Sequence, residues 1–204
     1  MASDAPFIVT GNYAAASDGG GFLVTFSQDG LEGEVAGISY AGGEAMPLAC
    51  EWKVEEDVRY LTFKMEDSEF YIRPGEKDGK DMLLGRWVDD AGDSGAWNLA
   101  PMPSFAKDFK AEDLTGKWFT PGPGEGAPAW IMDVEKDGEN WKGSFTLDGE
   151  TFAIMMSASE KTFALLDGEG QTKLEDKDFE PVSDGIALRF PLGEDDGQLW
   201  WRSV

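Results

Sequence analysis

The 204-residue chain contains no histidine and only one cysteine, Cys50. Serine–histidine and cysteine–histidine catalytic pairs are therefore excluded, because both use an imidazole as the general base. The usual zinc, copper and non-haem iron ligand sets are excluded on the same grounds, and no intrachain disulfide can form. Cys50 lies beside apolar residues in MPLACEWKV, which indicates a packed side chain rather than a reactive thiol.

Basic residues are also scarce. Lysine and arginine number 17 against 40 aspartates and glutamates, so the formal net charge is −23. Nucleic acids and anionic membrane surfaces attract the opposite sign, and neither is expected as a partner. The acidic excess fits a solvated surface, an adaptation to high salt, or a surface that attracts cations or a basic partner protein.

Long apolar runs and targeting signals are missing as well. No stretch approaches the roughly 18 consecutive apolar residues that cross a bilayer. The start, MASDAPFIVTGNY, has neither a basic nor an apolar signal region. We therefore expect a soluble, cytoplasmic protein without membrane insertion. The glycine-rich runs at 19–22 and 122–126 precede predicted strands rather than helices, so they are turns and not phosphate-binding loops.

An internal repeat is present. TGNY at 10–13 and TGKWF at 115–119 each precede a Gly/Pro-rich turn, an apolar strand pattern and an Asp-Gly turn. The two halves also end alike, in an alignment that pairs Trp97 with Leu199 and Leu99 with Trp201. Self-similarity of this kind indicates a duplicated domain. The predicted division is a first domain over 1–101, a linker over 102–114 with one or two helical turns within 104–112, and a second domain over 115–204.

Hydrophobic residues alternate with a period of two, as in Phe22, Val24, Phe26 and again in Leu61, Phe63. Together with frequent Asp-Gly turns, this predicts all-β structure with about eight short strands per half. The predicted strands lie near 8–14, 21–27, 31–39, 46–54, 58–65, 69–73, 82–88 and 95–100, and near 116–120, 129–135, 141–147, 151–157, 161–166, 173–181, 186–191 and 198–203. Successive hairpins favour an up-and-down antiparallel meander that closes its edges. We therefore expect two tandem β-barrels.

Gly116-Lys117-Trp118 resembles the opening motif of lipocalins and avidins, and TGKWF…WIMDVEKDGENWKGSF is similar to the start of an avidin-type barrel. The first half has Tyr13 where that motif has tryptophan. The resemblance implies a lipocalin-like barrel in each half, with Trp118 and Tyr13 closing the barrel floors. It does not imply biotin or retinoid binding, because no binding residue matches.

An acidic turn, DDAGDSG at 89–95, has a counterpart, GEDDG at 193–197, at the same place in the second half. A turn of aspartate and glycine between two strands predicts a hairpin in both halves. Loop carboxylates could also bind calcium weakly, although EF-hand spacing is lacking. No metal or other cofactor is expected; the weak candidates for calcium are Asp89, Asp90, Asp93, Asp195 and Asp196.

The eight tryptophans either fill the barrel cores or line a cavity. If a barrel holds an apolar ligand, the candidate lining residues are Tyr13, Trp87, Trp97, Trp118 and Trp130. Trp200 and Trp201 are adjacent, so they must point to opposite faces of one strand. One of them then lies outside its own barrel, where it packs against the other barrel or binds a partner protein.

Three functions fit these observations. The preferred one is a non-enzymatic, acidic interaction or assembly module that binds another protein. The second is a lipocalin-like carrier of a small apolar ligand. The third is a carbohydrate-active enzyme that uses a pair of carboxylates from 55–57, 89–93 or 194–196. An eight-stranded barrel has room for side chains or for one small ligand, and the many Phe, Met and Trp residues predict filled interiors.

Overall fold

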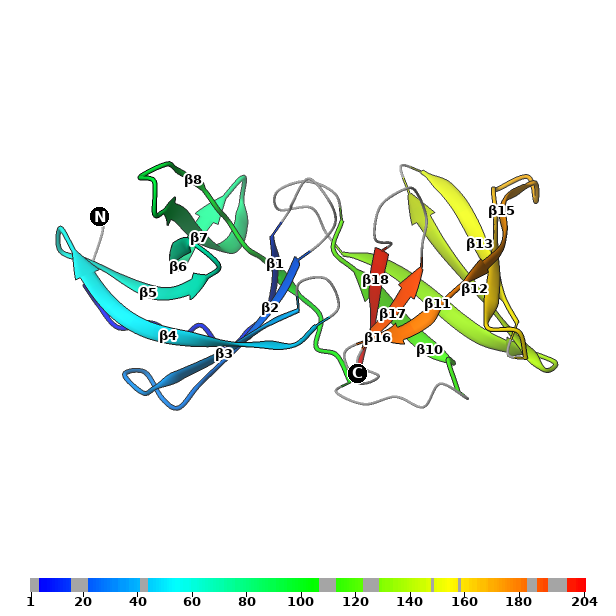
Figure 1. Ribbon diagram of the computed structural model, residues 1–204, viewed down its shortest axis with the longest axis horizontal. Helices are drawn as coiled ribbons and strands as arrows, with labels where there is room; N and C mark the ends of the chain where they lie inside the picture. Colours follow the sequence, from blue (N-terminus) through cyan, green and yellow to red (C-terminus); the bar gives the residue numbers. More distant parts are fainter. Residues whose placement is uncertain are drawn as a thin grey trace.

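The computed structural model describes residues 4–15, 22–40, 44–106, 113–122, 129–147, 149–157, 159–182, 187–190 and 198–204. Every regular element in these ranges is a β-strand, and the strands form two antiparallel nine-stranded sheets (Figure 1). None of the described residues belongs to a helix that could span a bilayer. The expectation of an all-β chain with two tandem barrels is confirmed.

The first sheet comes from the first half of the chain. Its strands are β1 (Gly11–Ala15), β2 (Phe22–Gln28), β3 (Val35–Tyr40), β4 (Met46–Glu55), β5 (Val58–Met65), β6 (Ser68–Lys77), β7 (Lys80–Asp89), β8 (Ser94–Ala96) and β9 (Ala100–Met102). Their spatial order is β8-β7-β6-β5-β4-β3-β2-β1-β9. The two edges, β8 and β9, are therefore consecutive parts of one extended segment.

This segment, residues 94–102, closes the first barrel. It pairs with β7 from Val88↔Ser94 onward, and the bridge between Leu83 and Leu99 continues the same register. It then pairs with β1 over Ala100–Met102. Because one segment bonds to both neighbours, β8 and β9 act as a single strand, and the barrel has eight strands in the described part of the chain.

The second sheet closes in a related way. Its strands are β10 (Gly116–Thr120), β11 (Trp130–Asp137), β12 (Asn140–Leu147), β13 (Glu150–Met156), β14 (Thr162–Leu166), β15 (Thr172–Asp178), β16 (Glu180–Val182), β17 (Ala187–Phe190) and β18 (Gln198–Arg202). β15 pairs with β14, and β16, separated from β15 by Phe179 alone, pairs with β17. β18 pairs with β10. The broken strand is thus the sixth of this barrel, whereas it is the eighth of the first.

Each predicted strand position overlaps a strand of the structure. The helical turns predicted within 104–112 fall mostly on 107–112, which lie outside the described residues. In the same predicted linker, Phe105 forms an isolated antiparallel bridge with Ser203. This contact ties the connection between the barrels to the end of the second one.

Both barrel interiors are filled by side chains. In the first, Phe63 stacks on Phe70 with ring centroids 5.4 Å apart, and Trp97 lies 4.4 Å from Phe70. In the second, Trp200 lies 5.5 Å from Phe145. The buried residues of the first core are Val9, Ala15, Val24, Phe26, Val35, Leu48, Leu61, Phe63, Phe70, Ile72, Leu83 and Leu99. Those of the second core are Leu114, Trp118, Met132, Val134, Trp141, Phe145, Ile154, Met156, Phe163, Phe179, Leu188, Phe190 and Trp200.

A third apolar cluster joins the two barrels. Leu23 and Tyr40 contribute from the first barrel, and Phe119 and Trp201 from the second. Phe105 from the connecting segment meets Tyr40 edge-on at 5.5 Å. Figure 1 shows β1 and β2 on the side of the first barrel that faces the second. Leu23 alternates with the inward-facing Val24 and pairs with Tyr40, so the cluster packs the outer wall of β2 and β3 against the outer wall of the second barrel.

Trp200 and Trp201 point to opposite faces of β18, as adjacent residues of a strand must. Trp200 lies in the second core, and Trp201 lies outside that barrel, in the cluster between the barrels. The interpretation that one of them packs against the other barrel is confirmed. Both are at most 1% exposed, so neither indole is accessible to a partner protein. A partner surface must be sought elsewhere.

The repeat alignment is wrong by one residue at the chain ends. Trp97 and Leu99 belong to the first core, whereas the aligned Leu199 and Trp201 belong to the cluster between the barrels. A shift of one residue moves a side chain to the opposite face of a strand. Trp200, which faces inward, is therefore the better counterpart of the inward-facing residues in the first barrel.

Candidate binding site

The aromatic residues predicted to line a ligand cavity are not brought together. Tyr13, Trp87 and Trp97 pack against the first core. Trp118 and Trp130 belong to the second. Trp118 is fully buried, and its Nε1 donates a 2.8 Å hydrogen bond to the carbonyl oxygen of Leu114. These side chains fill the barrels instead of surrounding one common cavity.

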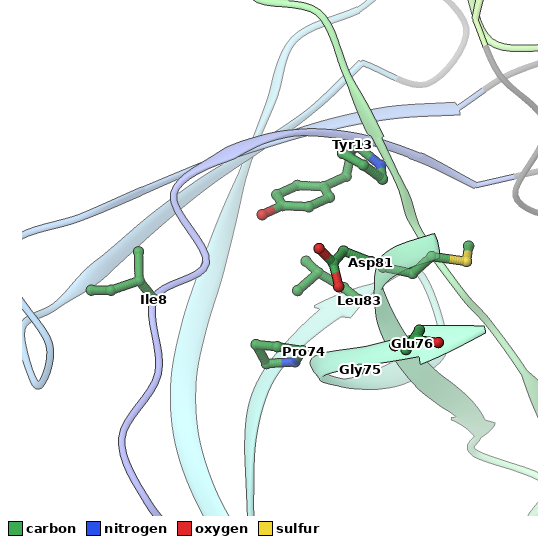
Figure 2. Close-up of a pocket in the computed structure, with 9 residues that line it drawn as sticks. Ile8, Tyr13, Pro74, Gly75, Glu76, Asp81 and Leu83 are labelled. Carbon is green, nitrogen blue, oxygen red and sulfur yellow. The ribbon is translucent and has the colours of Figure 1, made fainter. Parts of the chain in front are cut away.

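A pocket of about 500 Å³ lies at one end of the first barrel (Figure 2). The N-terminal segment, β1, the β6–β7 hairpin and β9 all contribute to it. Its lining residues are Ile8, Tyr13, Pro74, Gly75, Glu76, Asp81, Met82, Leu83 and Pro101. Three parts of the chain that are distant in sequence thus converge on one opening.

Hydrogen bonds from the Gln28 side chain hold the N-terminal segment across this end of the first barrel. The Gln28 Oε1 accepts a 3.0 Å hydrogen bond from the Val9 backbone N–H, and its Nε2 donates to the carbonyl oxygens of Phe7 and Leu31 at 3.1 Å each. Val9 is fully buried, and Phe7 packs edge-on against Trp52 at 5.0 Å. Anchoring on both sides holds the intervening Ile8 at the rim of the pocket.

The acidic side of the pocket follows from the register of the β6–β7 hairpin. Glu76 lies directly opposite Asp81, and Pro74 directly opposite Leu83. Leu83 belongs to the core, and side chains alternate along a strand, so Asp81 and Glu76 lie on the inward face, one step nearer the end. The hairpin therefore changes from apolar to acidic where the barrel opens.

The polar side chains of the pocket face one another across an opening. Figure 2 shows the Tyr13 hydroxyl and the Asp81 carboxylate directed into the space beside Ile8 and Pro74. Within the described ranges, the side chains of Tyr13, Glu76 and Asp81 form no hydrogen bond or ion pair. Burial raises the pKa of Tyr13 further above its ordinary value, and the phenol is protonated at neutral pH.

Exposed apolar side chains gather at the same end. Ile8 is 48% exposed, Leu31 51% and Val54 60%. The Gln28 amide binds the carbonyls of both Leu31 and the residue before Ile8, which brings these two segments together. Val54 is two residues after Trp52. The Trp52 Nε1 donates a 3.3 Å hydrogen bond to the carbonyl oxygen of Gly33, which is two residues after Leu31, so Val54 also lies near the Leu31 segment. We call the surface formed by Ile8, Leu31 and Val54 the outer end; Figure 1 shows the turns between β2 and β3 and between β4 and β5 on the side away from the second barrel.

A second pocket, of about 380 Å³, opens in the wall of the first barrel. β4 pairs with β5 only from Cys50↔Phe63 to the hairpin turn, so the first residues of β4 separate from the end of β5. The lining residues are Met46, Pro47, Leu48, Lys64, Met65, Glu66, Ser68 and Phe70. This pocket is largely apolar, with one base and one acid at its rim.

The outer face of β4–β7 carries aromatic and basic side chains that satisfy one another. The Arg86 guanidinium lies 4.3 Å from the Tyr71 ring and donates a 2.6 Å hydrogen bond to Glu55. Lys53 pairs with Glu69, which lowers the pKa of Glu69, and the Tyr71 hydroxyl donates to the same carboxyl group. These groups stabilise the sheet and leave little unpaired charge for a partner.

The acidic turn of the first half joins β7 to β8, as predicted. The Asp89 carboxylate accepts a 2.8 Å hydrogen bond from the Asp93 N–H, and the Asp90 N–H donates to the Asp67 carbonyl at 3.1 Å. The corresponding Asp195 and Asp196 lie outside the described residues. In the ranges that are described, no three acidic or cysteine side chains are grouped in a way that could hold a metal ion.

Cys50 is half-buried and packs against the first core. Burial raises the pKa of its thiol to about 11, although a hydrogen bond with the Gly37 backbone opposes the shift. A thiol with such a pKa is a poor nucleophile at neutral pH.

No family model, curated protein or solved structure matches this chain. Two of the three polar groups in the first pocket, Glu76 and Asp81, were not singled out from the sequence. Their signal was the two-residue turn at 78–79 in GEKDGKD, which sets residues 76 and 81 opposite each other.

Proposed function

We propose that the protein is a non-enzymatic, cytoplasmic interaction module without a cofactor, built from two lipocalin-like barrels. In this proposal, a partner protein binds at the outer end of the first barrel. The observation that carries it is that Ile8, Leu31 and Val54 are each about half exposed on linked segments, and that Ile8 also lines an open pocket. Grouped apolar side chains on a surface are typical of interaction sites.

The filled interiors support a function on the outer surface. Both cores are packed with aromatic rings, so little space remains inside for a carried molecule. The second barrel covers the outer wall of β2 and β3 through the cluster around Trp201, and Ile8, Leu31 and Val54 remain exposed. The molecule then presents one apolar end on a rigid support.

Charge specifies the kind of partner. The net charge of −23 and the carboxylates of Glu76 and Asp81 favour a partner segment that is basic as well as apolar. Electrostatic complementarity of this kind accelerates association and excludes acidic competitors. We therefore expect the partner to present apolar side chains next to lysine or arginine.

The test compares two pairs of substitutions that remove similar apolar surface. Leu31→Ser with Val54→Ser alters the outer end, and Ile131→Ser with Met155→Ser alters exposed residues of the second barrel. Proteins retained by the tagged chain in its own cells are quantified by mass spectrometry. We expect the outer-end variant to lose retention by about tenfold or more, as for central contacts of an interface. Equal retention by wild type and both variants would contradict the proposal.

A second candidate function is carriage of a small apolar ligand. The observation that favours it is the 380 Å³ pocket in the barrel wall, where Met46 and Met65 contribute adaptable side chains. Its volume lies near the lower end of the range for ligand sites, about 300–1,000 Å³. A carrier would retain a small molecule through gentle purification, whereas an interaction module would not.

A further inference from the structure

We infer that Gln28, Trp52 and the first core form a binding site for an extended apolar peptide segment, which residues 4–10 of the chain itself occupy. A partner protein then binds by displacing these residues with a segment of its own. That the replacement comes from a partner rests on the proposed function. The site does not, because its contacts are all made within this chain. We call it the segment site.

The first argument is that the N-terminal segment lies in the segment site as a peptide ligand would. Residues 4–10 belong to no strand, yet Phe7 and Val9 turn toward the barrel while Ile8 is 48% exposed, as in an extended chain. The Gln28 side-chain amide binds the backbone at both inward positions, through the Phe7 carbonyl and the Val9 N–H. Backbone hydrogen bonds of this kind hold an extended segment and leave the choice of sequence to its side chains.

The second argument is that the inward side chains set a sequence preference. Phe7 meets the Trp52 ring edge-on at 5.0 Å, and Val9 is fully buried in the first core. Ile8, between them, faces solvent with about half of its surface. The segment site therefore selects an aromatic residue followed, two positions later, by a β-branched one.

The third argument is that the segment site is held in place by contacts of its own. The Trp52 Nε1 donates to the Gly33 carbonyl at 3.3 Å, and the Arg59 guanidinium lies 4.8 Å from the Trp52 ring. The Gln28 Nε2 also donates to the Leu31 carbonyl. These contacts do not involve residues 4–10, so the site keeps them when the segment is exchanged. A preorganised site lowers the cost of binding a replacement.

Charge favours a replacement from a basic partner. The turns at 29–34 and 56–57 carry carboxylates, and the N-terminal segment contains Asp4 and no base. A segment with lysine in place of Asp4 has the better electrostatic complementarity. The attached segment has an effective concentration on the order of millimolar, so the partner must add further contacts. The exposed side chains of Leu31 and Val54 are available for them.

The test measures hydrogen exchange at the Val9 amide of the whole chain, with and without a capped peptide of sequence KAPFIVT. This probe copies residues 4–10 with lysine in place of Asp4. We expect millimolar peptide to lower the protection of Val9 by about tenfold or more, because it competes for the Gln28 amide. Val24, within β2, should keep its protection. KAPSIST, with serine in place of the phenylalanine and valine, should have no effect.

Two substitutions in the attached segment provide a matched pair. Phe7→Ala weakens the competing segment and leaves the segment site intact, so it is expected to strengthen KAPFIVT binding by about tenfold. Ile8→Ala removes apolar atoms from the exposed side of the same segment and should leave the affinity nearly unchanged. The affinity is measured by fluorescence anisotropy of the labelled peptide.

The inference is overturned if KAPFIVT leaves Val9 protected, if KAPSIST acts equally, or if Phe7→Ala and Ile8→Ala change the affinity by the same factor. A wild-type dimer that forms with rising concentration and is abolished by Gln28→Ala would identify a second copy as the occupant. That result would overturn the assignment to a partner.

The two proposals fail in different ways. If KAPFIVT displaces the attached segment but Leu31→Ser with Val54→Ser leaves partner retention unchanged, the segment site stands and docking at the outer end is wrong. If partner retention depends on the outer end but KAPFIVT does not deprotect Val9, docking stands and segment exchange is wrong.

Discussion

At the scale of single residues, Asp167 shows how one carboxylate organises a turn. Its Oδ1 accepts backbone hydrogen bonds from Glu169 at 3.0 Å and Gln171 at 2.8 Å, and its Oδ2 lies 2.9 Å from the Lys173 Nζ. The ion pair with Lys173, followed by these backbone donors, lowers the pKa of Asp167. The charged form of this side chain therefore fixes the connection between β14 and β15.

Asp167→Asn should destabilise the protein at neutral pH and have less effect in acid. A carboxyl group whose pKa is lower in the folded state contributes stability above its unfolded pKa, and this contribution is lost as the pH falls through the folded pKa. The measurement is the urea midpoint of both proteins at about pH 7 and about pH 2. Glu139→Gln serves as the charge control; an Asp167→Asn deficit that is equal at both pH values would contradict this account.

Residue roles were only partly predictable from the sequence. Alternation along a strand required Trp200 and Trp201 to face opposite ways, and they do. Tyr13 was predicted as a barrel plug or cavity residue, and the structure places it at the edge of an open pocket. Glu76 and Asp81 were missed, because their importance depends on the segment that crosses the barrel end, and no local pattern encodes that contact.

At the scale of elements, strand positions follow from local chemistry and barrel closure does not. Period-two alternation and Asp-Gly turns located the strands, because both signals lie within a few residues of each element. The closing strands are interrupted, at 97–99 in the first barrel and at Phe179 in the second. Which edges such strands join depends on hydrogen bonds between distant segments, and these leave no local pattern.

Asn98 supports the interruption in the first barrel. It is 8% exposed, and its Oδ1 accepts a 3.1 Å hydrogen bond from the Gly85 N–H, while the Trp97 N–H donates to the Gly85 carbonyl at 2.9 Å. Here the side chain substitutes for a backbone acceptor and lets the segment leave β7 for β1.

Asn98→Ala should lower the free energy of unfolding by about 1–3 kcal/mol, because it leaves the Gly85 N–H without its acceptor. Urea unfolding gives the loss, and hydrogen exchange at the Gly85 amide locates it. Ser94→Ala, on an exposed position of the same segment, is the control and should change little. Unchanged protection at Gly85 in the Asn98→Ala protein would show that this hydrogen bond does not hold the closing strand.

At the scale of the whole molecule, two filled barrels are joined through one apolar cluster. The duplication was visible in the sequence because turns and aromatic residues recur in the same order. How the barrels pack could not be read, since Leu23, Tyr40 and Trp201 meet only after both barrels have formed. This arrangement covers the outer wall of β2 and β3 and leaves Ile8, Leu31 and Val54 exposed.

The central claim is that the barrels are filled and that the protein acts through its surface. Native mass spectrometry of the chain, purified gently from its own source, tests this most directly. We predict a species with the mass of the chain plus a second protein, and no stoichiometric small-molecule adduct. A chain that carries one molecule of a few hundred daltons in most copies, released only on unfolding, would contradict the claim and favour the carrier.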